Sequence, residues 1–180
     1  FIVQPEVADL LPRLAWHLDE PLGDSSLIVT ALVSELARRE VTVALSGIGG
    51  DELFFGYPRY VGAKLARHYE RLPLPLRRGV GRLARWIPAS ARSDNPPGRL
   101  RRFLEAGPLA QAERYLSWVS FLDAGALAEL VPGRRNGGDP RALHLAHWGR
   151  CAGADLVDAL LYLDLMTYLP DDLLMLGDKM

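Results

Sequence analysis

The sequence predicts an α/β fold, present as a mostly helical chain with one buried parallel strand. Apolar residues recur at three- and four-residue spacing along most of the chain, as they do in amphipathic helices. Residues 41–45 (VTVAL) are instead short, β-branched and almost wholly apolar, as expected of a strand covered on both faces. A glycine-rich turn follows them directly, which is a common way for strands to end in α/β sheets.

The helical pattern divides the chain into successive segments. The first is expected from Pro5 to about His17, and the second runs to about Arg39 from a cap at Asp24 or Ser25. Loops rich in proline and glycine are expected at 87–98 and 132–140. Further helices are expected near residues 59–71, 75–86, 98–106, 108–121, 123–131 and 154–169.

The composition excludes several classes of protein. With 180 residues, 49% of them hydrophobic, the chain can bury the core of one soluble domain. Its 21 basic and 22 acidic residues give a net charge of −1, so no overall field favours nucleic acid or anionic lipid. Apolar runs fall far short of the ~20 residues of a membrane helix. We therefore expect neither nucleic acid nor a membrane as a partner.

The cysteine content bears on the cellular compartment, and the ends of the chain bear on whether it is a fragment. One cysteine, Cys151, cannot form an internal disulfide, which fits a reducing compartment. The chain starts at Phe1 rather than Met and stops at Met180 without a natural end signal. We therefore expect a cytoplasmic protein of which this chain is a fragment.

The strongest constellation for chemistry lies in residues 46–52 (SGIGGDE). Glycines at 47, 49 and 50 allow positive φ and close approach, so their amides can converge on phosphate oxygens. The preceding strand would fix the position of this turn. A carboxylate beside a phosphate cradle makes sense when Mg²⁺ lies between the two anions, which points to Asp51 and Glu52. It is not a Walker loop, because no Gly-Lys-Ser/Thr follows.

A simpler interpretation of the same residues is a tight turn whose acids cap the next helix. Two neighbouring features favour phosphate binding instead. A loop rich in carboxylates precedes the turn at residues 19–26 (DEPLGDSS), and an aromatic run follows it at residues 54–60 (FFGYPRY).

These motifs resemble the synthetase domain of the glutamine-hydrolysing asparagine synthetases. The matching segments are 19–21 (DEP), 24–26 (DSS), 43–47 (VALSG), 49–54 (GGDELF), 56–60 (GYPRY), 168–174 (YLPDDLL) and 178–180 (DKM). Their order and spacing fit that family in the first 60 residues and again at the end of the chain.

The resemblance implies an adenine-nucleotide hydrolase-like parallel sheet with helices around it. Residues 1–60 would supply part of the nucleotide-binding core, and residues 61–180 a mainly helical portion of the same synthetase domain. In the implied reaction an aspartate carboxylate attacks the α-phosphate of ATP, which gives an acyl-adenylate and pyrophosphate. Ammonia then displaces AMP to give asparagine. The ammonia comes from glutamine through a glutaminase domain expected outside this chain.

The resemblance also implies roles for single residues. Asp51 would hold Mg²⁺ through the pyrophosphate, with Glu52 in support. The residues in contact with ATP would be Ser46, Gly47, Gly49 and Gly50. The carboxylate-rich loop would support the site through Asp19, Glu20, Asp24 and Ser25.

This sequence departs from the family pattern at two positions. Ile48 replaces a usually acidic residue that is tied to adenylate formation and ammonia handling. Phe55 replaces a common glycine and would narrow the space beside the turn. The family's Ser-Gly-Gly-x-Asp-Ser loop would precede Phe1 and its catalytic lysine would follow Met180, so we expect the chain alone to be inactive and its catalytic residues are unknown.

Three functions therefore remain open. The chain is part of an aspartate-activating amidotransferase, or of a paralogue that adenylates a different carboxylate, or of a binding or scaffold derivative without turnover. Ile48 favours the second. The sequence gives neither the acceptor nor the oligomeric state.

Other candidate residues have simpler explanations. Cys151 lies in no recognisable motif. His144 and His147 have a spacing compatible with metal binding, but no acidic or cysteine partner lies at ligand spacing, so a surface or packing role is expected. The arginines at 77–102 interleave with apolar residues at helical spacing, which favours a solvated helix face over a nucleic-acid or docking surface.

Overall fold

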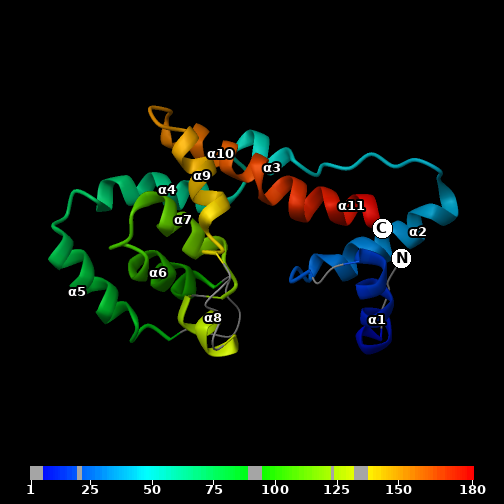
Figure 1. Ribbon diagram of the computed structural model, residues 1–180, viewed down its shortest axis with the longest axis horizontal. Coiled ribbons are helices and arrows are strands. Elements are labelled where there is room, and N and C mark those ends of the chain that lie inside the picture. Colours follow the sequence, from blue (N-terminus) through cyan, green and yellow to red (C-terminus); the bar gives the residue numbers. More distant parts are fainter. Residues whose placement is uncertain (1–5, 20–21, 89–94, 123, 132–137) are drawn as a thin grey trace. The chain divides into compact units, whose positions relative to one another are not determined.

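The computed structural model describes residues 6–19, 22–88, 95–122, 124–131 and 138–180. The chain divides into two compact units, each of which is described by itself (Figure 1). Unit 1 combines residues 1–54 with residues 161–180, and unit 2 holds residues 55–160.

The predicted α/β fold is wrong, because the described residues contain helices and no strand or sheet. The segment predicted as a buried strand is extended only in part and is open to solvent. Val41, Val43 and Leu45 are 47%, 78% and 100% exposed. A strand exists only through hydrogen bonds to a neighbouring strand, and no described segment provides that partner. A β-branched, apolar segment therefore does not form a strand by its composition alone.

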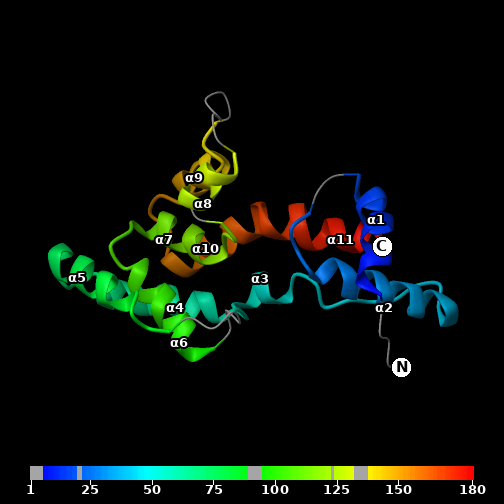
Figure 2. The ribbon, with the colours of Figure 1, turned by 90° about the horizontal axis from the view of Figure 1, so that it is seen from below.

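Unit 1 is built on a leucine core that joins both ends of the chain. Leu10, Leu14 and Leu18 recur every fourth residue along one face of the first helix, and they are buried together with Leu27 and Leu176. The helix that carries Leu176 packs against the first two helices, and Figures 1 and 2 show the three together. The helices are α1 (Val7–Leu18), α2 (Ser26–Glu40), α3 (Gly50–Phe54), the π-helix η1 (Leu169–Leu174) and α11 (Met175–Lys179).

A proline explains why the helical path changes after α10 (Leu156–Met166). Pro170 has no amide proton to donate to the carbonyl of Met166, and its ring crowds that carbonyl. The chain continues as the π-helix η1, while the Asp171 amide keeps an α-helical bond to Thr167 O at 3.1 Å. Pro170 thus accounts for the missing α-helical bond to Met166 O.

Unit 2 packs its helices around buried tyrosines. Tyr60 is 0% and Tyr115 is 1% exposed, and their rings stack with centroids 6.3 Å apart. Arg59 joins this cluster, since its Nε donates to Tyr115 Oη at 2.8 Å and its guanidinium lies 3.7 Å from the Tyr57 ring centroid. The helices are α4 (Pro58–Tyr69), α5 (Leu74–Ala84), α6 (Pro96–Glu105), α7 (Gln111–Val119), α8 (Ala124–Leu130), α9 (Ala142–Arg150) and the start of α10.

A buried arginine holds the connection between α6 and α7. Arg114 is 3% exposed and lies 2.9 Å from Glu70, and it also donates to the carbonyls of Ala106, Gly107 and Leu109. These carbonyls lie just beyond the end of α6, and two of them also accept from Leu109 N and from Arg77. Arg114 therefore adds donors that fix this loop.

The predicted helices are confirmed to within a few residues at most boundaries. Pro5, expected at the first helix start, lies outside the described residues. At the second helix Asp24 performs the capping, because its Oδ1 accepts from the Ser26 amide at 2.8 Å while the Ser25 side chain makes no cap bond. Helices α3 and α9 were not among the expected ranges. Among the described residues, no helix has the length and apolarity needed to cross a membrane.

Candidate functional site

The glycine-rich turn depends on one glycine for its shape. Gly49 has φ 91°, whereas Gly47 and Gly50 do not have positive φ. The Gly50 amide donates to Gly47 O at 3.1 Å and closes the turn. The Ile48 amide donates to Ser46 Oγ at 3.2 Å. A side chain at position 49 would be strained whatever space it had, so this glycine is required by the backbone.

The other two glycines leave open space beside the turn. A Cβ built on Gly47 or on Gly50 would meet no atom within 4 Å. Ser46 and Gly47 are also exposed to solvent. A ligand can therefore approach the backbone of this turn closely.

The two acids that follow the turn lie in different environments. Asp51 is exposed in the first turn of α3, whereas Glu52 is 1% exposed and makes contacts within the protein. Neighbouring residues of a helix point about 100° apart, which explains the difference. Asp51 can therefore meet a ligand, and Glu52 belongs to the packing.

The described residues contain no group of three or more histidine, cysteine, aspartate or glutamate side chains that could hold a metal ion. Asp51 alone fits a Mg²⁺ that takes most of its ligands from phosphates and water, which is how this ion is commonly held beside nucleotides. The exposed carboxylate next to an open glycine turn is compatible with that arrangement.

The carboxylate-rich loop is tied to the C-terminal end of unit 1. Asp19 has φ 65° at the end of α1, and its carboxylate accepts from Lys179 Nζ at 2.9 Å. The hydrogen bond from Lys179 and its positive charge hold the pKa of Asp19 below its usual range. Glu20, also predicted as a supporting residue, lies outside the described residues. Ser25 is exposed at the start of α2.

A carboxyl pair forms between Asp24 and Asp172, which are far apart in sequence. Burial and the nearby Asp24 carboxylate raise the pKa of Asp172 to about 6. Asp172 Oδ1 is buried without a hydrogen-bond partner. The sequence showed Asp172 only within a matching motif, and no local spacing signalled that it would meet Asp24.

The turn and the loop contact the same segment, residues 169–179. A Cβ built on Gly49 would lie 3.6 Å from Leu169 Cδ1, and one built on Gly177 would lie 3.7 Å from Ile48 Cδ1. Asp172 and Lys179 of the same segment meet Asp24 and Asp19. Residues 169–179 therefore link the glycine turn to the carboxylate-rich loop.

Phe55 follows α3 in an unusual conformation. Its φ is 63°, a left-handed value that favours glycine, which is the residue common at this position in the family that the motifs resemble. Its ring stacks on Tyr60 with centroids 5.0 Å apart, and Lys64 Nζ lies 4.6 Å from the ring centroid. Aromatic packing therefore offsets the backbone strain.

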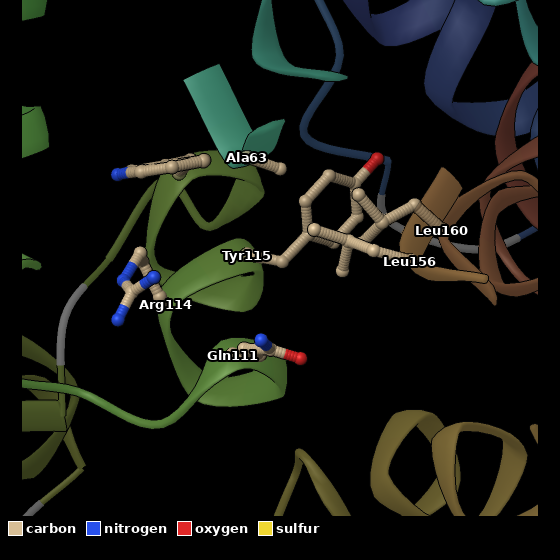
Figure 3. Close-up of a pocket in the computed structure, with 7 residues that line it drawn as sticks. Ala63, Gln111, Arg114, Tyr115, Leu156 and Leu160 are labelled. Atoms are coloured by element: carbon tan, nitrogen blue, oxygen red, sulfur yellow. The ribbon is translucent and has the colours of Figure 1, made fainter. Parts of the chain in front are cut away.

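A recess in unit 2 is too small for a nucleotide. Its volume is about 10 Å³, roughly the room for one water molecule. Figure 3 shows Tyr115 of α7 directed toward Leu156 and Leu160, with Arg114 on the other side of the helix. This recess is a packing gap, lined by Ala63, Gln111, Arg114, Tyr115, Trp118, Leu156 and Leu160.

The remaining candidate residues have structural explanations. Burial raises the pKa of the Cys151 thiol, which disfavours the reactive thiolate. Cys151 Sγ lies 3.5 Å from His147 O, and His147 is itself buried. On α5, Arg78 and Arg82 are exposed, as is Arg85 just after it, whereas Arg77 donates to Leu72 O and Gly107 O.

An open glycine turn leaves its backbone amides accessible to an anionic ligand. The sequence matches the family described as Asparagine synthase over residues 1–180. The chain belongs to the asparagine synthase family.

Curated relatives agree with this membership. The chain is 34% identical over 174 residues to a Mycobacterium tuberculosis protein provisionally named asparagine synthetase (glutamine-hydrolysing), which covers 97% of this chain and 26% of the relative. It is 28% identical over 180 residues to asparagine synthetase (glutamine-hydrolysing) 1 of Bacillus subtilis, covering 99% of this chain and 27% of that protein. The chain thus spans about a quarter of the length of these relatives. No solved structure matches it.

The conformation of Phe55 predicts an order of stability among its variants. Phe55→Ala loses the stacked ring and keeps the strained φ, whereas Phe55→Gly loses the ring and the strain. We expect Phe55→Gly to be more stable than Phe55→Ala by about 1 kcal/mol. Urea denaturation of both variants measures this difference. An alanine variant at least as stable as the glycine variant would contradict the left-handed conformation.

The carboxyl pair predicts a pH dependence. The folded state holds the Asp172 proton more tightly than the unfolded state does, so this group's contribution to stability is lost as pH rises from about 4 to about 6. We expect Asp172→Asn to match the unsubstituted protein at pH 4. At pH 8 it should be more stable by about 1 kcal/mol, after allowance for the partial exposure of the carboxyl.

Urea denaturation at pH 4, 6 and 8 measures the difference between the two proteins. Asp171→Asn is the matched control, because it removes the same charge from an exposed neighbour on the same helix. A difference that stays constant with pH, or that the control reproduces, would show that Asp172 does not titrate against Asp24.

Proposed function

We propose that this chain is part of the synthetase domain of a glutamine-dependent asparagine synthetase. The observation that carries the proposal is the family match over the whole chain, together with an open glycine turn and an exposed Asp51 where the motifs place the nucleotide. In the proposed reaction the aspartate side-chain carboxylate attacks the α-phosphate of ATP. Pyrophosphate leaves, and ammonia derived from glutamine displaces AMP from the acyl-adenylate.

Within this reaction, the turn at residues 46–50 would bind phosphate oxygens. Ser46 and Gly47 are exposed, and no atom crowds the Cα of Gly47 or Gly50, so a polyphosphate can approach the backbone. Backbone amides cost little to reorganise during reaction, which is why they stabilise developing negative charge effectively. Asp51 would hold Mg²⁺, which when bound neutralises the charge that builds on the leaving pyrophosphate.

The supporting acids would act through position rather than by contact with ATP. Asp19 is paired with Lys179, and Asp24 caps α2 through the Ser26 amide. Glu52 is buried. These residues would hold the polypeptide around the turn, and the residue that performs acid–base chemistry stays unassigned.

A second function is favoured by Ile48. Its side chain is 43% exposed and lies near Gly177 of α11. An apolar group therefore stands at the position where the motif resemblance implies an acid. Isoleucine can neither transfer a proton nor attract an ammonium ion. A paralogue that adenylates a carboxylate other than aspartate would not need that acid.

Replacement of Asp51 tests the first proposal. In the full-length protein, Asp51→Asn should lower kcat on the order of 10²-fold and raise the KM for ATP much less, because the contact acts mainly on charge that develops in the transition state. Pyrophosphate release with ATP, Mg²⁺ and aspartate measures both constants. Asp158→Asn, an exposed acid on α10, is the matched control and should change neither. Equal turnover by Asp51→Asn would make Asp51 a helix-capping acid.

Replacement of Ile48 tests the second function, a paralogue with a different acceptor. If the acceptor has changed, Ile48→Glu should raise aspartate-dependent pyrophosphate release at least several-fold, whereas Ile48→Val should leave it unchanged because valine restores no charge. The unsubstituted protein should then prefer another carboxylate in a panel of acceptors. Normal use of aspartate with Ile48 in place would reject this alternative.

A further inference from the structure

The sequence assigned the position of the glycine turn to a preceding strand, and the structure removes that support. Residues 41–45 form no strand, and Leu45, directly before the turn, is fully exposed. Within unit 1, α3 continues from the turn, and residues of the C-terminal segment lie beside it.

Leu169 and Gly177 make those contacts. A Cβ built on Gly49 would lie 3.6 Å and 3.7 Å from the two Cδ atoms of Leu169, which places the buried backbone of Gly49 against that side chain. Ile48 Cδ1 lies 3.7 Å from a Cβ built on Gly177. Since glycine has no Cβ, these distances show that the Leu169 side chain lies beside the Gly49 backbone and the Ile48 side chain beside the Gly177 backbone, with no crowding.

The C-terminal segment is itself firmly held. Leu176 is 2% exposed in the core with leucines of α1 and α2. Lys179 Nζ also lies 2.9 Å from Asp19 Oδ2. A support that is fixed by a hydrophobic core and an ion pair can transmit a fixed position to the turn.

We infer that η1 and α11 position the glycine turn for phosphate binding, and that Leu169 and Gly177 are positioning residues for the ATP-dependent step. The inference rests on the proposed function for its consequence in catalysis, but its structural part stands without it. A displaced turn would lose the convergence of its amides, and a shift of about 1 Å in such a site costs up to 10²-fold in rate.

The test compares Leu169→Ala with Leu174→Ala in the full-length protein. Leu174 lies on the same π-helix but is 48% exposed, so it offers the same change of side chain without contact to the turn. Leu169→Met, which keeps the volume, is the rescue variant. Amide hydrogen exchange at residues 48–51 is measured first, because it needs no activity.

We expect exchange at residues 48–51 to be faster in Leu169→Ala and unchanged in Leu174→Ala and Leu169→Met. We also expect kcat/KM for ATP to fall at least 10-fold in Leu169→Ala, mainly through kcat, and to stay within about twofold in the other two. Equal exchange in Leu169→Ala and Leu174→Ala would overturn the inference. If the unsubstituted protein releases no pyrophosphate, the proposed function fails, and the exchange result still decides whether the segment positions the turn.

Discussion

The burial of Leu176 is the constraint on which the candidate site depends. Leu176 packs with Leu10, Leu14, Leu18 and Leu27, so a residue near the C-terminal end completes a core begun by the first helix. Full burial of one leucine side chain contributes about 1.5–3 kcal/mol, whereas a typical neutral hydrogen bond contributes about 0.5–1.5 kcal/mol. Removal of α11 would leave the leucine face of α1 open to water.

The position of Leu176 also orients the residues around it. Because η1 and α11 are continuous helices, fixing Leu176 fixes Leu169, Asp172 and Lys179, which lie three to seven residues away. Two of these meet the carboxylate-rich loop and one backs the glycine turn. The apolar core is thus what brings polar residues from distant parts of the sequence to one place.

Unit 2 depends on a different constraint, because a buried charged group needs partners for its hydrogen bonds. Arg114 is almost fully buried, and a guanidinium in that position needs both an anion and acceptors for its remaining donors. Glu70 supplies the anion, and the loop carbonyls between α6 and α7 supply the acceptors. Gly107 fits this crowded loop because a Cβ there would lie 2.5 Å from a Tyr69 ring carbon. The hydrogen bonds of Arg114 and the close packing at Gly107 therefore both fix the conformation of the loop between α6 and α7.

The helices could be predicted from the sequence because their signal is local. The three leucines of α1 repeat at helical spacing, and Asp24 stands where a cap is needed. The segment 41–45 shows the opposite case, since a strand depends on a partner that the segment itself does not encode. The burial of Glu52 and the pairing of Asp172 with Asp24 could not be predicted for a related reason. Both depend on residues that come together only in the fold.

The distribution of acids in unit 1 fits a site for an anionic ligand. Several carboxylates beside a polyphosphate would repel it unless cations compensate their charge. Lys179 compensates Asp19, whereas Asp24 and Asp172 face each other and Glu52 is buried rather than exposed at the turn. Among the described acids of the two motifs, this leaves Asp51 as the exposed carboxylate of the turn, placed where a divalent cation could convert its charge from a repulsive to an attractive one.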